Sequence, residues 1–173
     1  GVGRSRRRAA SLAPSARVTW VTPERMHLTV RFIGHVDEMR ATAIVEALRE
    51  SLGVEAFELT VEGTGAFPPK GAPRVVWAGL AGGLTEVEAV EREVTRRLTQ
   101  LGIAAEDRPY RPHLTLARVK EPARLRAATL LDGLEQHVFG RVPVNAITLF
   151  ESRLSPKGPT YVPLLRTTLR GRT

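Results

Sequence analysis

The sequence predicts an α+β protein of two pseudo-symmetric β-α-β-β lobes, whose largely antiparallel sheets face a central cleft. Three observations lead to this prediction. Short stretches that alternate apolar and polar residues indicate half-buried strands. Longer stretches with apolar residues at helical spacing indicate amphipathic helices. Finally, the pattern His-Leu-Thr followed by an aliphatic residue occurs twice, at His27 and at His113. With only four histidines in the chain, chance repetition of this pattern is rare.

The elements expected in the first half are a strand at 17–21, a turn at 22–24, a motif strand at 26–32, a helix from 37 to about 52, a strand at 57–61, a loop at 63–72 and a strand at 74–80. Asp37 is a favoured N-cap for the helix, and Gly53 is a favoured stop. Met39, Ile44 and Leu48 recur at helical spacing and are expected to face inward.

The second half begins with a helix for which Thr85 and Glu88 form a capping box. Its apolar stripe is Leu84, Val87, Val90, Val94, Leu98 and Leu101, and Gly102 closes it. The second motif strand is expected at 112–118. Pro122 then opens a third helix carrying Leu125, Leu131 and Leu134, followed by strands at 142–151 and 160–169 joined by a turn at 155–159.

The order strand, helix, strand, strand follows each motif. His113 lies 86 residues after His27 (113 − 27), and this offset carries the elements after the first motif onto those after the second. Internal duplication is the simplest account. A strand and a helix precede the second motif. Subtracting 86 residues places the counterpart of that helix on residues 1–15 and the counterpart of that strand before residue 1. Either the native chain starts further upstream, or this copy has lost its first strand.

Composition bounds the class of protein. The chain has 173 residues, enough for one self-sufficient domain, which we expect at 17–173 after a basic irregular leader at 1–16. It has no cysteine, so disulfides and thiol catalysis are excluded, and no apolar run long enough for a membrane span. The net charge of +8 is explained equally by an anionic partner such as nucleic acid and by an arginine-rich genome.

The two motifs suit acid–base chemistry at a phosphodiester. Alternation places His27, Thr29 and Arg31 on one strand face, and His113 with Thr115 on one face of the other. One neutral and one protonated imidazole can take and give a proton near pH 7, while the hydroxyls donate to phosphate oxygens. Structural strand histidines are the alternative. Two histidines without a nearby acidic residue provide too few ligands for a metal ion. A serine triad is not indicated either, because the sequence has no nucleophile-elbow motif.

The paired motifs resemble the 2H phosphoesterase family and its HxTx motif, in particular the RNA 2′,3′-cyclic phosphodiesterase (2′-5′ RNA ligase-like) branch. The segments similar to that family are TPERMHLTVRFIG at 22–34, FPP at 67–69, RVVWAGL at 74–80, RPHLTLAR at 111–118 and the hairpin from 151 through 161. One departure is the family's usual opening strand, Arg-x-Phe-aliphatic-Ala, which this chain lacks.

The resemblance implies metal-independent hydrolysis of RNA 2′,3′-cyclic phosphate ends to 2′-phosphomonoesters. It implies that His27 donates a proton to the leaving O3′ and that His113 is the base for water, with Thr29 and Thr115 holding the phosphate. Arg31 is a candidate phosphate contact. Simple alternation puts Arg118 on the face opposite His113, but strand ends twist and the family carries an arginine there.

Other expectations complete the analysis. Tyr110 and Tyr161 are candidate contacts for a base, whereas Trp77 is expected in the core, and His35 and His137 are expected at the surface. No cofactor and no metal are expected. The expected substrates are RNA ends or small cyclic nucleotides, acted on by a cytoplasmic monomer. Ligation of cyclic-phosphate ends to 5′-hydroxyl ends, and non-catalytic RNA or nucleotide binding, remain alternatives.

Overall fold

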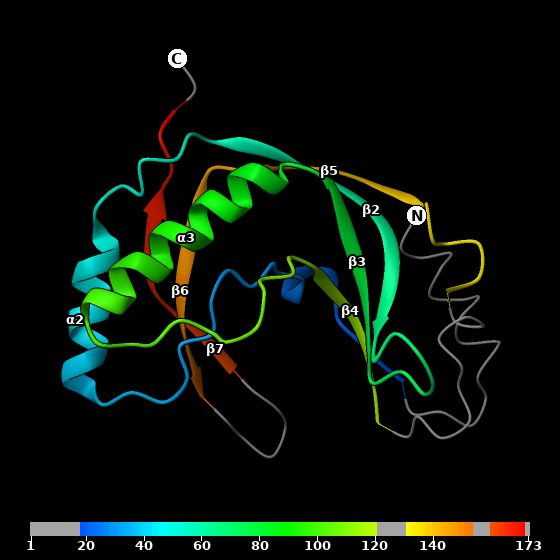
Figure 1. Cartoon of the computed structure of the whole chain (residues 1–173), viewed down its shortest axis with the longest axis horizontal. Helices are drawn as coiled ribbons and strands as arrows, with labels where there is room; N and C mark the ends of the chain where they lie inside the picture. The colour runs from blue at the N-terminus through cyan, green and yellow to red at the C-terminus, as the bar shows by residue number, and fades with distance from the viewer. Residues whose placement is uncertain (1–17, 121–130, 154–159, 172–173) are drawn as a thin grey trace. The chain divides into compact units, whose positions relative to one another are not determined.

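The computed structural model describes residues 18–120, 131–153 and 160–171, which form two compact units (Figure 1). The elements are β1 (Val18–Trp20), η1 (Pro23–Arg25), α2 (Glu38–Arg49), β2 (Phe57–Phe67), β3 (Val75–Gly82), α3 (Leu84–Gln100), β4 (Leu114–Val119), β5 (Val138–Val144), β6 (Ala146–Arg153) and β7 (Thr160–Thr168). Of the described residues, the first unit comprises 18–29, 59–84, 111–120 and 131–142, and the second comprises the others.

The first unit is built on a five-stranded sheet in the order β1-β4-β3-β2-β5. The pairs β1–β4, β4–β3 and β3–β2 are antiparallel. One face carries the hydrophobic core, which includes Val76, Ala78 and Ala117, each 2% exposed or less, with Trp20 packed against them. The opposite face is therefore free to carry polar and functional side chains.

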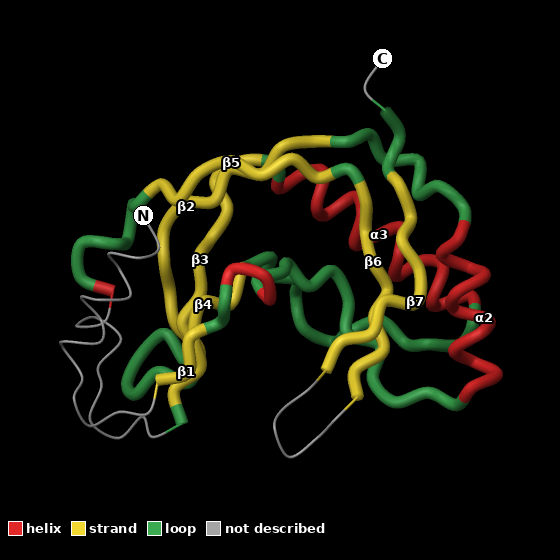
Figure 2. Tube along the Cα trace, turned by 180° about the vertical axis from the view of Figure 1, so that it is seen from behind, coloured by secondary structure: helices red, strands yellow, loops and turns green. Residues whose placement is uncertain are grey.

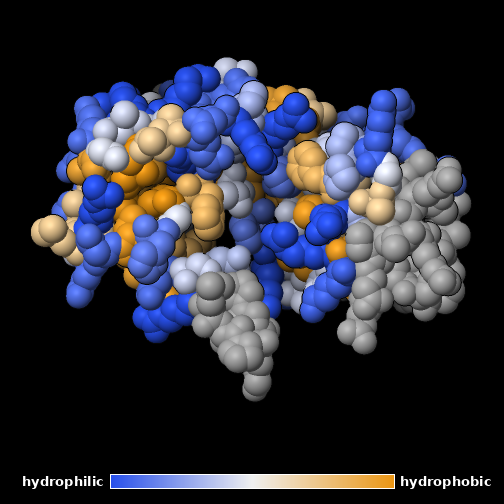
Figure 3. Space-filling view, turned by 60° about the horizontal axis from the view of Figure 1, so that its bottom comes forward, coloured by the Kyte–Doolittle hydropathy of each residue, from blue (hydrophilic) through white to orange (hydrophobic). Residues whose placement is uncertain are grey.

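The second unit combines helices α2 and α3 with the antiparallel hairpin β6–β7, and Figure 2 shows both long helices there. The buried Thr167 hydroxyl on β7 donates to the Leu48 carbonyl on α2 (2.6 Å). Hydrophobic residues also gather at the surface, over the part of the molecule that holds α2 (Figure 3). Phe32 and Met39 are 73% and 79% exposed.

Several sequence predictions are confirmed. The α+β class with antiparallel sheets is observed. The Asp37 side chain caps α2 by accepting a hydrogen bond from the Arg40 N–H (2.8 Å). The buried positions of α3 are Val87, Val90, Val94 and Leu98, as its apolar stripe predicts. The leader at 1–16, most of the third helix and the turn at 155–159 lie outside the described residues.

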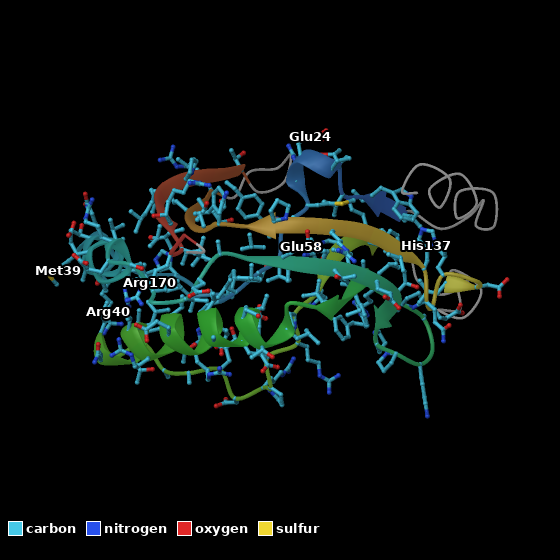
Figure 4. All side chains as sticks on the ribbon, turned by 90° about the horizontal axis from the view of Figure 1, so that it is seen from above. Glu24, Met39, Arg40, Glu58, His137 and Arg170 are labelled. Atoms are coloured by element: carbon cyan, nitrogen blue, oxygen red, sulfur yellow. The ribbon has the colours of Figure 1, made fainter. Side chains whose placement is uncertain are left out.

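Other expectations were wrong. Helix α3 begins at Leu84, so Thr85 lies inside the first turn and not at the N-cap. Met39 was expected inward but points outward from α2 (Figure 4). Strand β2 continues to Phe67 through the predicted loop. It does so because register shifts between Thr60 and Thr64 admit Gly63, whose positive φ of 74° suits glycine.

The contiguous repeats do not correspond to the two units. Strand β3 of the first repeat pairs with β4 of the second, with Val76 opposite Ala117. The first motif joins the same unit through an antiparallel bridge between Leu28 and Leu114. The His-Leu-Thr residues of both motifs, 27–29 and 113–115, therefore lie in one unit, whereas the duplication predicted one motif in each lobe. Strand pairing depends on which apolar faces fit together in the core. The order of the elements along the chain does not determine this.

Candidate active site

The two motifs lie side by side in the first unit. Residues 26–32 were predicted to form a strand, but only Leu28 is paired there, opposite Leu114 at the start of β4. The register of this pair sets His27 opposite Thr115 and Thr29 opposite His113. Since directly opposed residues share a face, all four polar side chains lie on the face away from Leu28 and Leu114. Those two leucines lie toward the core, against which Leu114 packs.

This register also sets the spacing of the histidines. His27 and His113 are diagonal neighbours, for which cross-strand spacing is about 7–8 Å. The His27 residue is exposed and His113 is partly exposed, so neither lies in a sealed interior. One small anion can therefore be contacted by both imidazoles, each with a threonine hydroxyl beside it.

The two imidazoles are held in the same way. The Nδ1 atom of His27 lies 2.8 Å from the Arg25 carbonyl oxygen, and Nδ1 of His113 lies 2.7 Å from the Arg111 carbonyl oxygen. A carbonyl oxygen only accepts hydrogen bonds, so Nδ1 must carry a proton in both rings. In each ring Nε2 is then the nitrogen that remains available to a ligand.

An aromatic pair, Phe67 and Trp77, contacts His113. The Phe67 ring meets the imidazole edge-on at a centroid distance of 5.3 Å, and the Trp77 ring lies 6.2 Å away. Trp77 is opposite Gly65 and Thr115 in the sheet, so its indole lies on the face of the motifs. The expectation that Trp77 is a core residue was wrong, because it faces away from the core cluster.

A β-bulge decides the position of Arg118. Val76 pairs with Ala117 but Trp77 pairs with Thr115, which leaves Leu116 as an extra residue in β4. The extra residue reverses the alternation, so Leu116 and Ala117 are both buried in succession. Arg118, opposite Val75, consequently shares the face of Thr115 and is exposed. Simple alternation had placed Arg118 on the other face.

The remaining sequence candidates lie in the second unit. Arg31 donates to the Ala104 carbonyl and pairs with Glu106 (3.4 Å), and its side chain is 7% exposed. Tyr110 is partly buried, and burial, with the Glu91 carboxylate, raises the pKa of its phenol. Their assignment to phosphate and base contacts stays a prediction.

Tyr161, the other candidate base contact, is 47% exposed and belongs to the second unit. Its ring meets Phe150 of the neighbouring strand at a centroid distance of 6.2 Å. The role assigned to Tyr161 also stays a prediction.

The other two histidines lie apart from the motifs. His35 is exposed as predicted, whereas His137 is partly buried, next to β5, with its ring 4.8 Å from that of Phe139. Among the described residues, no three histidine, cysteine or acidic side chains gather as a metal site would require. Within the same ranges no helix has the length and apolar character needed to cross a membrane.

Sequence reasoning missed Phe67 and Gly65 as parts of the site. A Cβ at residue 65 would lie 2.0 Å from a carbon of the Trp77 indole, so only glycine leaves room for this ring. A glycine inside a strand often marks such a close approach. That signal is present in the sequence, but the glycines and prolines of 63–72 predict a loop there.

The fold and the site define an α+β protein with two histidine motifs on one sheet face. The chain matches the 2′-5′ RNA ligase superfamily over residues 4–155 and belongs to that superfamily, which confirms the resemblance to 2H phosphoesterases. A protein of Aeropyrum pernix named RNA 2′,3′-cyclic phosphodiesterase is 40% identical over 162 residues, 92% of each chain. One of Methanothermobacter thermautotrophicus with the same name is 36% identical over 148 residues, 84% of this chain and 79% of its own.

Solved structures share the fold. The crystal structure of a Thermus thermophilus protein has a TM-score of 0.71 and 30% identity, over 99% of this chain and 93% of that one. The structure of Escherichia coli LigT complexed with 3′-AMP has a TM-score of 0.71, over 96% of this chain and 91% of that one. At 24% identity the second likeness concerns the fold alone.

Proposed function

We propose that this chain hydrolyses the 2′,3′-cyclic phosphate at RNA ends to a 2′-phosphomonoester, by general acid–base catalysis with His27 and His113. The observation that carries the proposal is the matched pair of imidazoles on one sheet face, each held through Nδ1 by the carbonyl two residues before it. Relatives up to 40% identical bear the name RNA 2′,3′-cyclic phosphodiesterase, which supports the same substrate class.

The chemistry uses one imidazole on each side of the phosphorus. Nε2 of His113 takes a proton from water as the water oxygen bonds to phosphorus. The P–O3′ bond breaks in line with this attack, and Nε2–H of His27 gives its proton to O3′. The product keeps the phosphate on O2′. His113 gains the proton that water loses, and His27 loses the proton that O3′ gains. Two imidazoles therefore suffice, and no metal or cofactor is required.

The surroundings of the two rings support this division of roles. A leaving O3′ brings a ribose and an RNA chain with it, whereas attacking water needs little space. His27 is the exposed histidine, and His113 is the one enclosed by Phe67 and Trp77. Space for the nucleoside is therefore available at His27, and His113 suits a small nucleophile.

Polar neighbours suit the phosphate. The hydroxyls of Thr29 and Thr115 share the face of the imidazoles and can donate to the non-bridging oxygens. Arg118 lies on the same face, about 7 Å along the strand from Thr115, and its long side chain can reach developing negative charge. Substrate contacts from Arg31, Tyr110 and Tyr161, which belong to the second unit, stay predictions of the sequence.

The test is turnover of a nucleoside 2′,3′-cyclic phosphate, and of an oligoribonucleotide with a cyclic end, in excess chelator. Phosphorus NMR identifies the bond that opens. We expect a 2′-phosphomonoester, and a loss of about 100-fold or more in kcat for His27→Ala and for His113→Ala. His35→Ala is the matched control, because His35 is exposed and outside the motifs.

Each alternative has its own outcome. Loss of turnover in chelator contradicts the two-imidazole mechanism. Tight binding of the cyclic end without product identifies a binding module. Joined product on addition of RNA with a 5′-hydroxyl end identifies ligation as the main reaction. We further propose that the chain acts as a monomer in the cytoplasm and also accepts small cyclic nucleotides, which gel filtration, cell fractionation and the nucleotide assay test.

A further inference from the structure

The two catalytic imidazoles differ in one respect, which is the aromatic contact at His113. Phe67 and Trp77 lie 5.5 Å apart between ring centroids, and both lie within 6.2 Å of the His113 ring. All three belong to the first unit, and Trp77 and Thr115 are directly opposed in neighbouring strands. We define Phe67 and Trp77 as the aromatic wall of the site.

The aromatic wall is held firmly in place. The indole lies directly over the backbone of Gly65, where a Cβ would meet three of its ring carbons at 2.0, 2.3 and 2.6 Å. The Trp77 Nε1 atom is buried and has no hydrogen-bond partner among the described residues, which shows how closely the ring is packed. A ring packed on a strand backbone cannot retreat to make room for a larger molecule beside His113.

We propose that the aromatic wall restricts the nucleophile activated by His113 to water, and so makes the chain a hydrolase and not a transferase to alcohols. The inference rests on the proposed function. An alcohol would react by the same steps as water. Its hydroxyl proton passes to Nε2 of His113, its oxygen bonds to phosphorus, the P–O3′ bond breaks, and O3′ takes the proton of His27. The product is then a 2′-phosphodiester of the alcohol, which for an RNA 5′-hydroxyl is a 2′–5′ linkage.

Steric exclusion is the physical basis of this choice. Water and methanol have similar hydroxyl chemistry, but methanol carries one additional carbon. A packed pocket can discriminate one carbon by about tenfold or more. Removing part of the indole opens space beside His113, while both histidines and both threonines are retained in the sequence. The selectivity between nucleophiles should then fall, whatever happens to the overall rate.

The test measures the ratio of alcoholysis to hydrolysis for a nucleoside 2′,3′-cyclic phosphate in dilute methanol, by separating the methyl 2′-phosphodiester from the 2′-phosphomonoester. We expect Trp77→Leu, and independently Phe67→Leu, to raise this ratio about tenfold over the unaltered chain. Only active molecules form either product, so the ratio does not depend on the fraction that folds. A second arm replaces methanol with an oligoribonucleotide bearing a 5′-hydroxyl.

Trp20→Leu is the matched control. Trp20 is the other tryptophan of the chain, and it packs against the core on the opposite face of the same sheet. An equal loss of volume there should leave the ratio unchanged. The inference is overturned if Trp77→Leu and Phe67→Leu leave the ratio within about twofold of the unaltered chain, or if Trp20→Leu raises it equally. Absence of any turnover in the unaltered chain would instead overturn the proposed function, and this inference with it.

Discussion

Gly65→Ala tests the link between one missing side chain and the geometry of the site. The added methyl group would meet the Trp77 indole carbons at 2.0–2.6 Å, closer than real Cβ atoms approach other heavy atoms. Backbone on both sides is fixed by the pairing of Gly65 with Trp77 in neighbouring strands. The indole must therefore move, and the rings it touches are those of Phe67 and His113.

Two opposing effects set the change in the free energy of unfolding caused by Gly65→Ala. Alanine in a strand is favoured over glycine by about 0.5–1 kcal/mol. Overpacking that forces side chains and backbone to shift costs about 1–3 kcal/mol. Because the contact at Gly65 is so short, we take the overpacking cost from the upper end of its range. After the gain from alanine is subtracted, the free energy of unfolding should fall by about 2 kcal/mol. A shift of His113 by about 1 Å would in addition lower kcat about 100-fold.

A double-mutant cycle provides the assay. Urea denaturation and cyclic-phosphate turnover are measured for Gly65→Ala, Trp77→Leu and the pair. Leucine lacks the indole carbons that a Cβ at residue 65 would meet, so Gly65→Ala should cost little in the Trp77→Leu background. Gly171→Ala is the control, because no described atom other than those of its chain neighbours lies within 4 Å of a Cβ there.

The reasoning is refuted if Gly65→Ala destabilises the chain equally with and without the Trp77 ring. The cost would then come from the backbone and not from the indole. Unchanged kcat in Gly65→Ala, with the fold intact, would separately show that the indole does not determine the position of His113.

Three further predictions concern charged groups. Arg97→Met should lower the free energy of unfolding by about 2–3 kcal/mol in urea, since its guanidinium donates to the carbonyls of Ala47, Glu50 and Ser51 near the end of α2. The pKa of Glu93 is lowered to about 2, first by its hydrogen bond from Arg96. Because its folded pKa lies below the unfolded one, Glu93 stabilises the fold above about pH 4.5 and this contribution is lost toward pH 2. It amounts to no more than about 1 kcal/mol near the surface, and Glu93→Gln should remove this slope in acid titrations. Arg118→Ala should lower kcat/KM about ten- to hundredfold with little change in melting temperature, since one charge-assisted hydrogen bond is worth about 1.5–3 kcal/mol.

Local patterns predicted the elements that depend on few partners. The helix cap at Asp37 and the buried stripe of α3 were correct, because capping and helical periodicity act within a few residues. The burial of Met39 was wrong, because a helical pattern does not say how far the neighbouring elements extend. Strand β2 was predicted too short because its glycines resemble a turn when no partner strand is known.

The faces of strand residues were less predictable. The apolar strand predicted a core position for Trp77, and simple alternation put Arg118 on the face opposite His113. Both side chains owe their observed faces to the pairing between β3 and β4. The bulge at Leu116 has no signature in the sequence of β4 alone, since it arises from the match to another strand. Phe67 was likewise missed because its contact with His113 joins residues 46 positions apart (113 − 67).

The sequence alone determined the chemistry available to this protein. Two His-x-Thr motifs, a net positive charge and the absence of cysteine follow from residue identity, and residue identity decides which protons and charges a site can offer. Only the tertiary structure decided that both motifs lie on one face of one sheet, that Arg118 joins them and that the aromatic wall stands beside His113. Strand pairing and side-chain packing are long-range interactions, and their outcome depends on every partner at once.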